Sequence, residues 1–281
     1  MKLCDLHSHS TFSDGTFSPA QLVHLAEEMG LSALALTDHN TPKGLPEFIE
    51  AGKNSTVETI PGCEFSSEYK GRELHIVGLF FPEKTWAEIE DFVEIMVMAK
   101  KNSNIKMIKK LNELRYDISY DEVAASTDAD EFNRAHVAKV LFQKGYVPSV
   151  DDAFQTLLKK GNGIYVPPKR IPSLATIKFI KHNGAAAILA HPFLNMNYEE
   201  LEEFLPKAKT AGLDAIETHY SKFSEEETRQ AKDLARRFNL KESGGSDFHG
   251  TVKPDIQLGS GRGNLKVPYE FKENLEKSAK K

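Results

Sequence analysis

The stretch Asp5-Leu-His-Ser-His-Ser-Thr-Phe-Ser-Asp-Gly15 places two histidines at alternate positions directly after a short apolar run. Residues two apart in a β-strand point to the same face of the sheet, so His7 and His9 can converge on one metal ion. Asp14 and a glycine turn follow them. Because a lone His-x-His pair also occurs by chance or as a surface pair, the rest of the chain must decide its role.

The next segments repeat one pattern. Ser18-Pro19 predicts a helix with a serine cap and proline in its first turn, and Gly30 ends it. A short apolar run then begins at Leu34 and meets polar residues only at Asp38-His-Asn40. This alternation of strand, helix and strand is typical of a parallel α/β fold.

The other predicted strands also end in polar side chains. The segments 57–65, 73–81, 185–190 and 241–246 are predicted strands, and they carry or precede the following groups: Glu64, His75, His191, Asp247 and His249. In a (β/α) barrel the loops after the strands meet at one face. The sequence therefore predicts a site assembled at that face.

The middle of the chain differs from this pattern. Residues 102–160 show helical periodicity without intervening strands, and we interpret them as a helical insertion. The barrel is then expected to comprise residues 1–101 and 161–281. Together these segments predict an α/β fold with one inserted cap domain.

The composition of the chain argues against several classes of protein. A net charge of −5 argues against a general DNA-binding protein. The only cysteines, Cys4 and Cys63, form no Cys-x-x-Cys motif and suggest reduced thiols. Neither a signal peptide nor a membrane span fits the sequence, so we expect a cytoplasmic protein, and no feature indicates a stable protein partner.

Ten imidazole and carboxylate groups lie at the predicted strand ends and the loops beside them: His7, His9, Asp14, Asp38, His39, Glu64, His75, His191, Asp247 and His249. Such ligands suit Zn, Mn or Fe, and their number exceeds what one ion needs. We therefore expect two or three divalent ions. Neighbouring ions suit phosphate-ester hydrolysis, because one activates a water and another neutralises the phosphoryl oxygens.

The motifs Asp5-Leu-His-Ser-His, Thr37-Asp-His-Asn40, Gly62-Cys-Glu64, Ala190-His-Pro192 and Gly245-Ser-Asp-Phe-His249 resemble, in order, those of the PHP (polymerase and histidinol phosphatase) phosphoesterases. The insertion resembles that of the subgroup acting on nucleotides and RNA 5′ ends. The resemblance implies a distorted seven-stranded (β/α) barrel with a metal cluster at its C-terminal face.

The resemblance also implies ligand sets. The first ion would be held by His7, His9, Glu64 and Asp247. The second would be held by Glu64, as a bridge, with His75 and His191. The third would be held by Asp14, His39 and His249; Asp14 stands where other branches have histidine, which favours a harder metal. Asp5 and Asp38 would accept ring N–H groups of ligand histidines, with Asp38 as a ligand the alternative.

Substrate-binding residues are expected mainly from the insertion and the segment after it. Asn133-Arg-Ala-His136 and Tyr165-Val-Pro-Pro-Lys-Arg170 resemble two segments of the subgroup. Arg134 and His136 would then contact phosphate, and Lys169 or Arg170 would add charge. His219 is the one histidine left where the subgroup has a Tyr-His-Pro-x-His-like run, and it is displaced by one position.

The combined interpretation is a phosphoesterase in which His39, His249 and Asp247 take part in catalysis. We favour a phosphomonoesterase on a small nucleotide, either AMP or a nucleoside 3′,5′-bisphosphate. The alternatives are a 5′-to-3′ exonuclease on short RNA or oligonucleotides, whose substrate would be the 5′ end, and a histidinol-phosphatase-like activity. A non-catalytic metal-binding module is the remaining interpretation.

Overall fold

The computed structural model describes residues 2–127, 132–159, 161–168 and 170–279 of the chain. These residues form two compact units, one comprising residues 1–91 with 171–281 and the other residues 92–170. The domain boundaries expected from the sequence, after residues 101 and 160, stay a prediction.

The first unit is built on one mixed sheet. Its strands are β1 (Leu3–Asp5), β2 (Ala33–Leu36), β3 (Glu58–Tyr69), β4 (Arg72–Leu79), β5 (Ala186–Leu189), β6 (Ala215–Tyr220), β7 (Lys241–Gly245) and β8 (Val267–Pro268). They follow the order β7-β6-β5-β4-β3-β2-β1-β8. The β3–β4 hairpin and the β4–β5 pair are antiparallel, whereas β1, β2 and β3 run parallel, as do β5, β6 and β7.

The sheet curls until its first strand meets its seventh. The Leu6 amide donates to the Gly244 carbonyl oxygen at 3.2 Å, and the Asp247 amide donates to the His7 carbonyl oxygen at 2.9 Å. Ser8 and Phe248 form a further parallel bridge. These bonds nearly close a barrel, which confirms the expected fold. The sheet has eight strands rather than seven because two residues, Val267 and Pro268, pair with β1.

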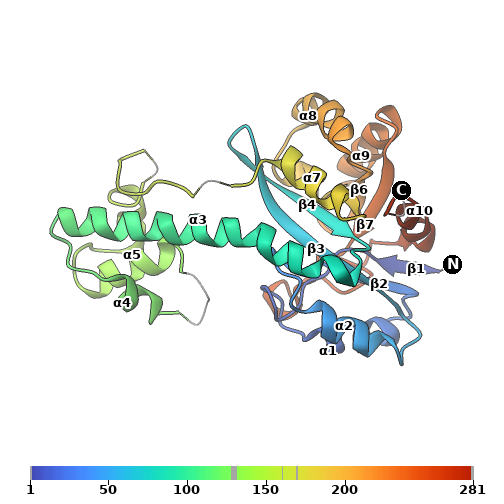
Figure 1. Ribbon diagram of the computed structural model, residues 1–281, viewed down its shortest axis with the longest axis horizontal. Coiled ribbons are helices and arrows are strands. Elements are labelled where there is room, and N and C mark those ends of the chain that lie inside the picture. The colour runs from blue at the N-terminus through green and yellow to red at the C-terminus, as the bar shows by residue number, and fades with distance from the viewer. Residues whose placement is uncertain (1, 128–131, 160, 169, 280–281) are drawn as a thin grey trace. The chain divides into compact units, whose positions relative to one another are not determined.

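Helices cover the outside of this sheet. They are α1 (Pro19–Glu28), α2 (Leu45–Gly52), α7 (Ser173–His182), α8 (Tyr198–Ala211), α9 (Glu225–Arg237) and α10 (Tyr269–Ala279). In Figure 1, α1 and α2 lie on one side of the sheet and α7, α8 and α9 on the other. Helix α1 begins as expected: the Ser18 hydroxyl accepts from the Gln21 amide, and Pro19 opens the helix.

The barrel interior is apolar at the end where the parallel strands begin. Buried side chains from β1 to β6 pack there with Leu275 of α10: among them are Cys4, Leu6, Ala33, Ile60, Val77, Ile188 and Ala215. Helix α10 is close to β1, β4, β5 and β7 and therefore closes this end. The opposite end, where the parallel strands finish, is left for polar side chains.

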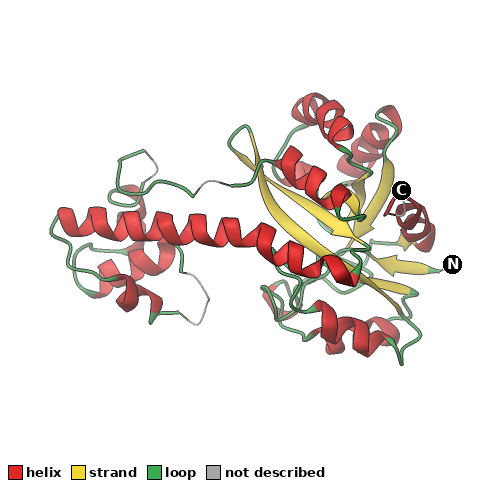
Figure 2. Cartoon of the chain, viewed as in Figure 1, coloured by secondary structure: helices red, strands yellow, loops and turns green. Residues whose placement is uncertain are grey.

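The second unit is helical (Figure 2). It contains most of α3 (Trp86–Glu113), together with α4 (Tyr120–Ala124), α5 (Arg134–Gln143) and α6 (Val150–Gln155). Helix α3 runs without interruption through residue 102, where the insertion was expected to begin. The unit has a separate core, in which Met107, Leu111, Phe132, Val137 and Leu141 are buried.

Candidate metal centre

The expected metal ligands come together at the carboxyl end of the barrel. His7 and His9 follow β1, His39 follows β2, Glu64 lies in β3 and His75 in β4. His191 follows β5, and Asp247 and His249 follow β7. Asp14 reaches the group from the loop after His9. Every residue assigned to metal binding from the sequence therefore lies in or beside one cluster.

The quartet expected for a first ion has compact geometry. His7, His9, Glu64 and Asp247 each offer a ligand atom within 4.8 Å of the others, and all four residues are buried. Nε2 of His7 lies 3.1 Å from Glu64 Oε2, and Nε2 of His9 lies 3.2 Å from the same oxygen. His9 Nε2 is also 3.3 Å from Asp247 Oδ1. Two imidazole nitrogens and two carboxylates thus face one point.

The set expected for a third ion forms a second group. Asp14, His39 and His249 lie together, and His9 joins them. His249 Nε2 is 3.2 Å from Asp14 Oδ1, and the Asp14 side chain is 55% exposed. This group is therefore the solvent-facing edge of the centre.

The two carboxylate oxygens of Glu64 face different groups of histidines. Its Oε1 lies 2.8 Å from His75 Nδ1 and 3.0 Å from His191 Nε2. Its Oε2 faces His7, His9 and His39, whose Nδ1 is 3.1 Å away. The compact group around the second position is His39, Glu64 and His75, with His191 reaching it through Oε1. A carboxylate placed this way suits a bridge between two ions.

Buried polar atoms without hydrogen-bond partners also suit the centre to cations. Among the described residues, six buried polar atoms have no hydrogen-bond partner: His7 Nε2, His9 Nδ1 and Nε2, His39 Nδ1, Glu64 Oε2 and His191 Nδ1. Buried nitrogen and oxygen atoms are normally hydrogen-bonded. These atoms belong to imidazole and carboxylate groups, which Zn, Mn and Fe accept as ligands. The buried clusters are therefore consistent with several metal sites.

Charges and burial within the centre shift the pKa values of its side chains. Burial would raise the pKa of Glu64, but the charges of His7, His39 and His75 hold it well below its usual range. Burial opposes protonation of His75, yet Glu64 and Glu73 raise the pKa of His75 to about 10. At His39 burial dominates and lowers the pKa to about 4. Burial would raise the pKa of Asp14, but the hydrogen bond from His249 together with the nearby histidine charges lowers it to about 2.

Three residues at the strand ends have left-handed backbone conformations. The φ angles are 51° at Asn40, 28° at His191 and 56° at Asp247. Such angles are costly for residues other than glycine and concentrate at functional sites. The strand ends of β2, β5 and β7 are thus bent where they present His39, His191 and Asp247.

Asp5 and Asp38 have other partners than those expected. Asp5 accepts from the amides of His7, Ser246 and Gly259 and from the Ser246 hydroxyl. Asp38 accepts from the amide and hydroxyl of Ser10 and from the Ser13 hydroxyl. Neither accepts a ring N–H in the described part of the chain, because both face the backbone of the ligand-bearing loops. Both carboxylates therefore anchor those loops.

Glu217 has the role expected of Asp5 and Asp38, and sequence reasoning missed it. Its Oε1 lies 2.7 Å from His7 Nδ1, and its Oε2 accepts from the His191 amide at 2.5 Å. Glu217 is 1% exposed in β6. The one available signal was a buried-strand pattern with a carboxylate in it, two residues before His219.

Two of the residues expected to bind substrate, Arg134 and His136, belong to the second compact unit and have partners within it. Arg134 donates to the Leu158 carbonyl oxygen, and its guanidinium lies over the Tyr165 ring at 4.3 Å. His136 Nδ1 accepts from the Asn133 amide and completes the N-terminal cap of α5. Both side chains therefore stabilise their own helical unit.

The remaining substrate residues are placed as follows. Arg170 is exposed in the same helical unit. Lys169 lies outside the described residues. His219 packs its ring against Phe271 of α10 at 5.2 Å, away from the metal ligands, because the bulge in β6 turns it outward. The displaced histidine is therefore a packing residue in this structure.

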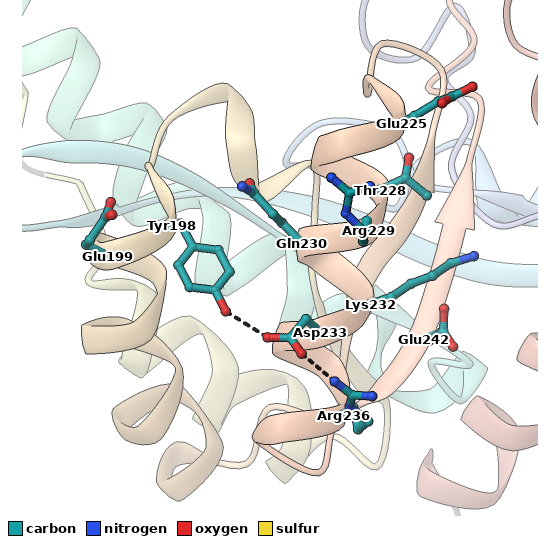
Figure 3. A pocket seen from close by; sticks show the side chains of 10 residues that line it. All are labelled: Tyr198, Glu199, Glu225, Thr228, Arg229, Gln230, Lys232, Asp233, Arg236 and Glu242. Carbon is teal, nitrogen blue, oxygen red and sulfur yellow. Dashed lines mark hydrogen bonds and ion pairs between the residues drawn. The ribbon is translucent and has the colours of Figure 1, made fainter.

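A separate hollow of about 1030 Å³ lies on the flank formed by α8, α9 and β7 (Figure 3). It is lined by Tyr198, Glu199, Glu225, Thr228, Arg229, Gln230, Lys232, Asp233, Arg236 and Glu242. Asp233 accepts from the Tyr198 hydroxyl and pairs with Arg236. No metal-centre residue lines this hollow, so it does not belong to the reaction site.

Comparisons with known proteins agree with this geometry. Residues 5–165 match the PHP domain family. A 5′-3′ exoribonuclease from Haemophilus influenzae is 34% identical over 88% of this chain and 90% of its own. A 3′,5′-nucleoside bisphosphate phosphatase from Chromobacterium violaceum is 26% identical over 87% and 86%.

A crystal structure is also similar in fold. A candidate metal-dependent phosphoesterase from Bifidobacterium adolescentis matches 99% of this chain and 96% of its own with a TM-score of 0.71 at 24% identity. Among the described helices, none is long and apolar enough to cross a membrane. The family match, the relatives and the buried histidine and carboxylate clusters lead to one conclusion: this chain belongs to the PHP family and is a metal-dependent phosphoesterase.

Proposed function

We propose that this enzyme is an exoribonuclease that hydrolyses RNA from its 5′ end. The observation that carries the proposal is the 34% identity to a 5′-3′ exoribonuclease over about nine-tenths of both chains. The nucleoside bisphosphate phosphatase is more distant, at 26% identity. The comparisons therefore favour the exonuclease alternative over the small-nucleotide phosphatase preferred from the sequence.

The metal centre supports this chemistry. When bound, divalent ions supply an activated water nucleophile and neutralise the phosphoryl oxygens. His7, His9, Glu64 and Asp247 would hold one ion, and Glu64 would share its other oxygen with the next position. The buried side of the centre excludes bulk water, because these four ligands are at most 4% exposed.

The solvent-facing edge is where a leaving oxygen would be protonated. His249 Nδ1 donates to the Asp247 carbonyl oxygen at 2.8 Å, which leaves its Nε2 facing Asp14. His39 directs Nδ1 to Glu64 and Nε2 toward Asp14, and its side chain is 25% exposed. We propose this edge, where His39 and His249 each turn Nε2 toward Asp14, as the place where that proton is delivered.

The helical unit supports recognition of a longer anion. Lysine and arginine outnumber aspartate and glutamate in residues 92–170, although the whole chain has a net charge of −5. Lys101, Lys106 and Lys109 are exposed on α3. Clustered lysines attract the phosphate backbone and make binding weaken as salt rises.

The test compares substrates on the manganese-loaded enzyme. Expected is stepwise shortening of a 3′-labelled, 5′-phosphorylated RNA, with a higher kcat/KM than for a nucleoside 3′,5′-bisphosphate or AMP. His9→Asn is expected to abolish turnover. His24→Asn is the matched control, because His24 is an exposed residue of α1 whose ion pair is with Glu28. If the enzyme hydrolysed the bisphosphate but left the RNA intact, the exonuclease proposal would be wrong and phosphatase activity would take its place.

A further inference from the structure

The two carboxylate oxygens of Asp247 have different surroundings. Oδ1 faces the ligand histidines, 3.3 Å from His9 Nε2 and 3.7 Å from His7 Nε2. Oδ2 accepts from the Tyr220 hydroxyl at 2.8 Å and from Lys253 Nζ at 2.9 Å. The carboxylate thus has one oxygen toward the metal position and one that is already bonded twice.

The two donors on Oδ2 come from different parts of the barrel unit. Tyr220 ends β6 and is 3% exposed, and its ring lies between His191, at 5.4 Å, and Phe223, at 5.1 Å. Lys253 follows the short 3-10 turn Gly250–Val252. Among the ion pairs of the described residues, Lys253 provides the one lysine or arginine nitrogen paired with a metal-centre side chain.

We propose that Tyr220 and Lys253 are positioning residues that make Asp247 a one-oxygen metal ligand. Without them the carboxylate is free to turn about its last bond and offer both oxygens to one ion. Groups that hydrogen-bond a ligand carboxylate fix its orientation and tune the metal. The lysine charge also offsets part of the aspartate charge, so the ion keeps more of its Lewis acidity.

The inference concerns metal binding and does not depend on which phosphoester is hydrolysed. It is therefore tested without substrate, on full-length protein stripped by chelator and titrated with Mn²⁺ or Co²⁺. Tyr220→Phe keeps the ring and removes only the hydroxyl. We expect roughly tenfold weaker Mn²⁺ binding, measured from the free-ion electron paramagnetic resonance signal.

The matched control is Tyr198→Phe. Tyr198 makes the same bond, its hydroxyl donating to Asp233 Oδ2 at 2.8 Å, but it lies on α8 away from the metal ligands. Its Mn²⁺ affinity is expected to equal that of the wild type. Equal affinity in Tyr220→Phe would overturn the proposal for Tyr220.

Lys253 requires a different measurement, because its charge repels the ion while its hydrogen bond orients the ligand. The visible spectrum of bound Co²⁺ reports coordination number, since absorption weakens as ligands are added. Lys253→Met, and more strongly the double variant with Tyr220→Phe, are expected to weaken this absorption as Oδ2 becomes a ligand. Lys222→Met, an exposed lysine, is the control. An unchanged spectrum in Lys253→Met, with a folded protein by circular dichroism, would overturn the role of Lys253.

Discussion

His7 is fixed from both sides of its ring. Nδ1 lies 2.7 Å from Glu217 Oε1, and Nε2 lies 3.1 Å from Glu64 Oε2. With the ring proton held on Nδ1 by Glu217, the Nε2 lone pair is available to an ion. Carboxylates in this position orient ligand histidines and raise their basicity.

Replacing Glu217 by glutamine tests this arrangement. The amide keeps the size of the side chain but loses the charge that retains the proton on His7 Nδ1. Metal affinity is expected to fall by roughly 10–100-fold, measured by calorimetric titration of the chelator-treated protein. Glu242→Gln is the control, because Glu242 in β7 accepts from the Thr218 hydroxyl of β6 and bonds no metal ligand among the described residues. A Glu217→Gln protein with wild-type affinity would contradict the assignment.

Protons compete with metal at this centre. His75 has a pKa of about 10 in the metal-free protein, and the pKa of His7 is also raised because Glu64 and Glu217 outweigh its burial. An ion must displace these protons, so metal binding releases protons and strengthens as pH rises toward the pKa of His75. Titrations between about pH 6 and about pH 8, in buffers of different ionisation enthalpy, measure both effects. Affinity independent of pH would refute the coupling.

Hydrogen bonds between the ends of β1 and β7 form a seam, and the two strands it joins are followed by His7 and Asp247. A methyl group on Gly245 would lie 2.4 Å from His7 Cβ and 2.5 Å from the His7 amide nitrogen. Gly245→Ala must therefore push the strands apart. We expect a loss of about 1–3 kcal/mol in the free energy of unfolding, together with weaker metal binding. Denaturant titration and metal titration measure the two effects.

Gly71 provides the comparison for this substitution. It lies in the turn between β3 and β4 with a φ of +79°, and a methyl group there meets no atom within 4 Å. Gly71→Ala is expected to cost stability through its backbone conformation alone and to leave metal affinity unchanged. If Gly245→Ala lost stability but kept its metal affinity, the seam would not position the ligands.

Metal binding should stabilise the whole barrel unit. Ligands that bind only the native state add about 2.7 kcal/mol at a concentration of 100 Kd. Since the centre joins loops after most strands, the unfolding temperature should rise by several degrees on adding Mn²⁺ to chelator-treated protein. Scanning calorimetry measures the shift, and His9→Asn should reduce it. An unfolding temperature unaffected by saturating metal would show that the ligands do not bind it jointly.

Much of the fold could be predicted from the sequence, because the parallel strands are buried apolar runs with polar residues at their ends. Strand β8 has only two residues, and its pairing with β1 depends on a contact across the whole chain. Helical periodicity does not indicate where one compact unit gives way to another along α3, so the boundary expected near residue 102 stays a prediction.

The grouping of the expected ligands could be predicted because most of them stand in short local motifs at strand ends, whereas His75 lies within β4. Their supporting residues could not. Glu217 is 210 positions from His7, and Tyr220 is 27 from Asp247, so no spacing in the sequence connects them. Phosphate binding by Arg134 stays a prediction, and in the structure its guanidinium lies over the Tyr165 ring.

The pairing of His7 with Asp247 across the β1–β7 seam has a consequence for synthesis of the protein. His7 and His9 leave the ribosome more than two hundred residues before Asp247 and His249. A nascent or prematurely terminated chain lacks one wall of the centre and has no complete set of ligands for the first ion. The four-ligand set of the first ion is therefore complete only when the last strands of the barrel have been synthesised.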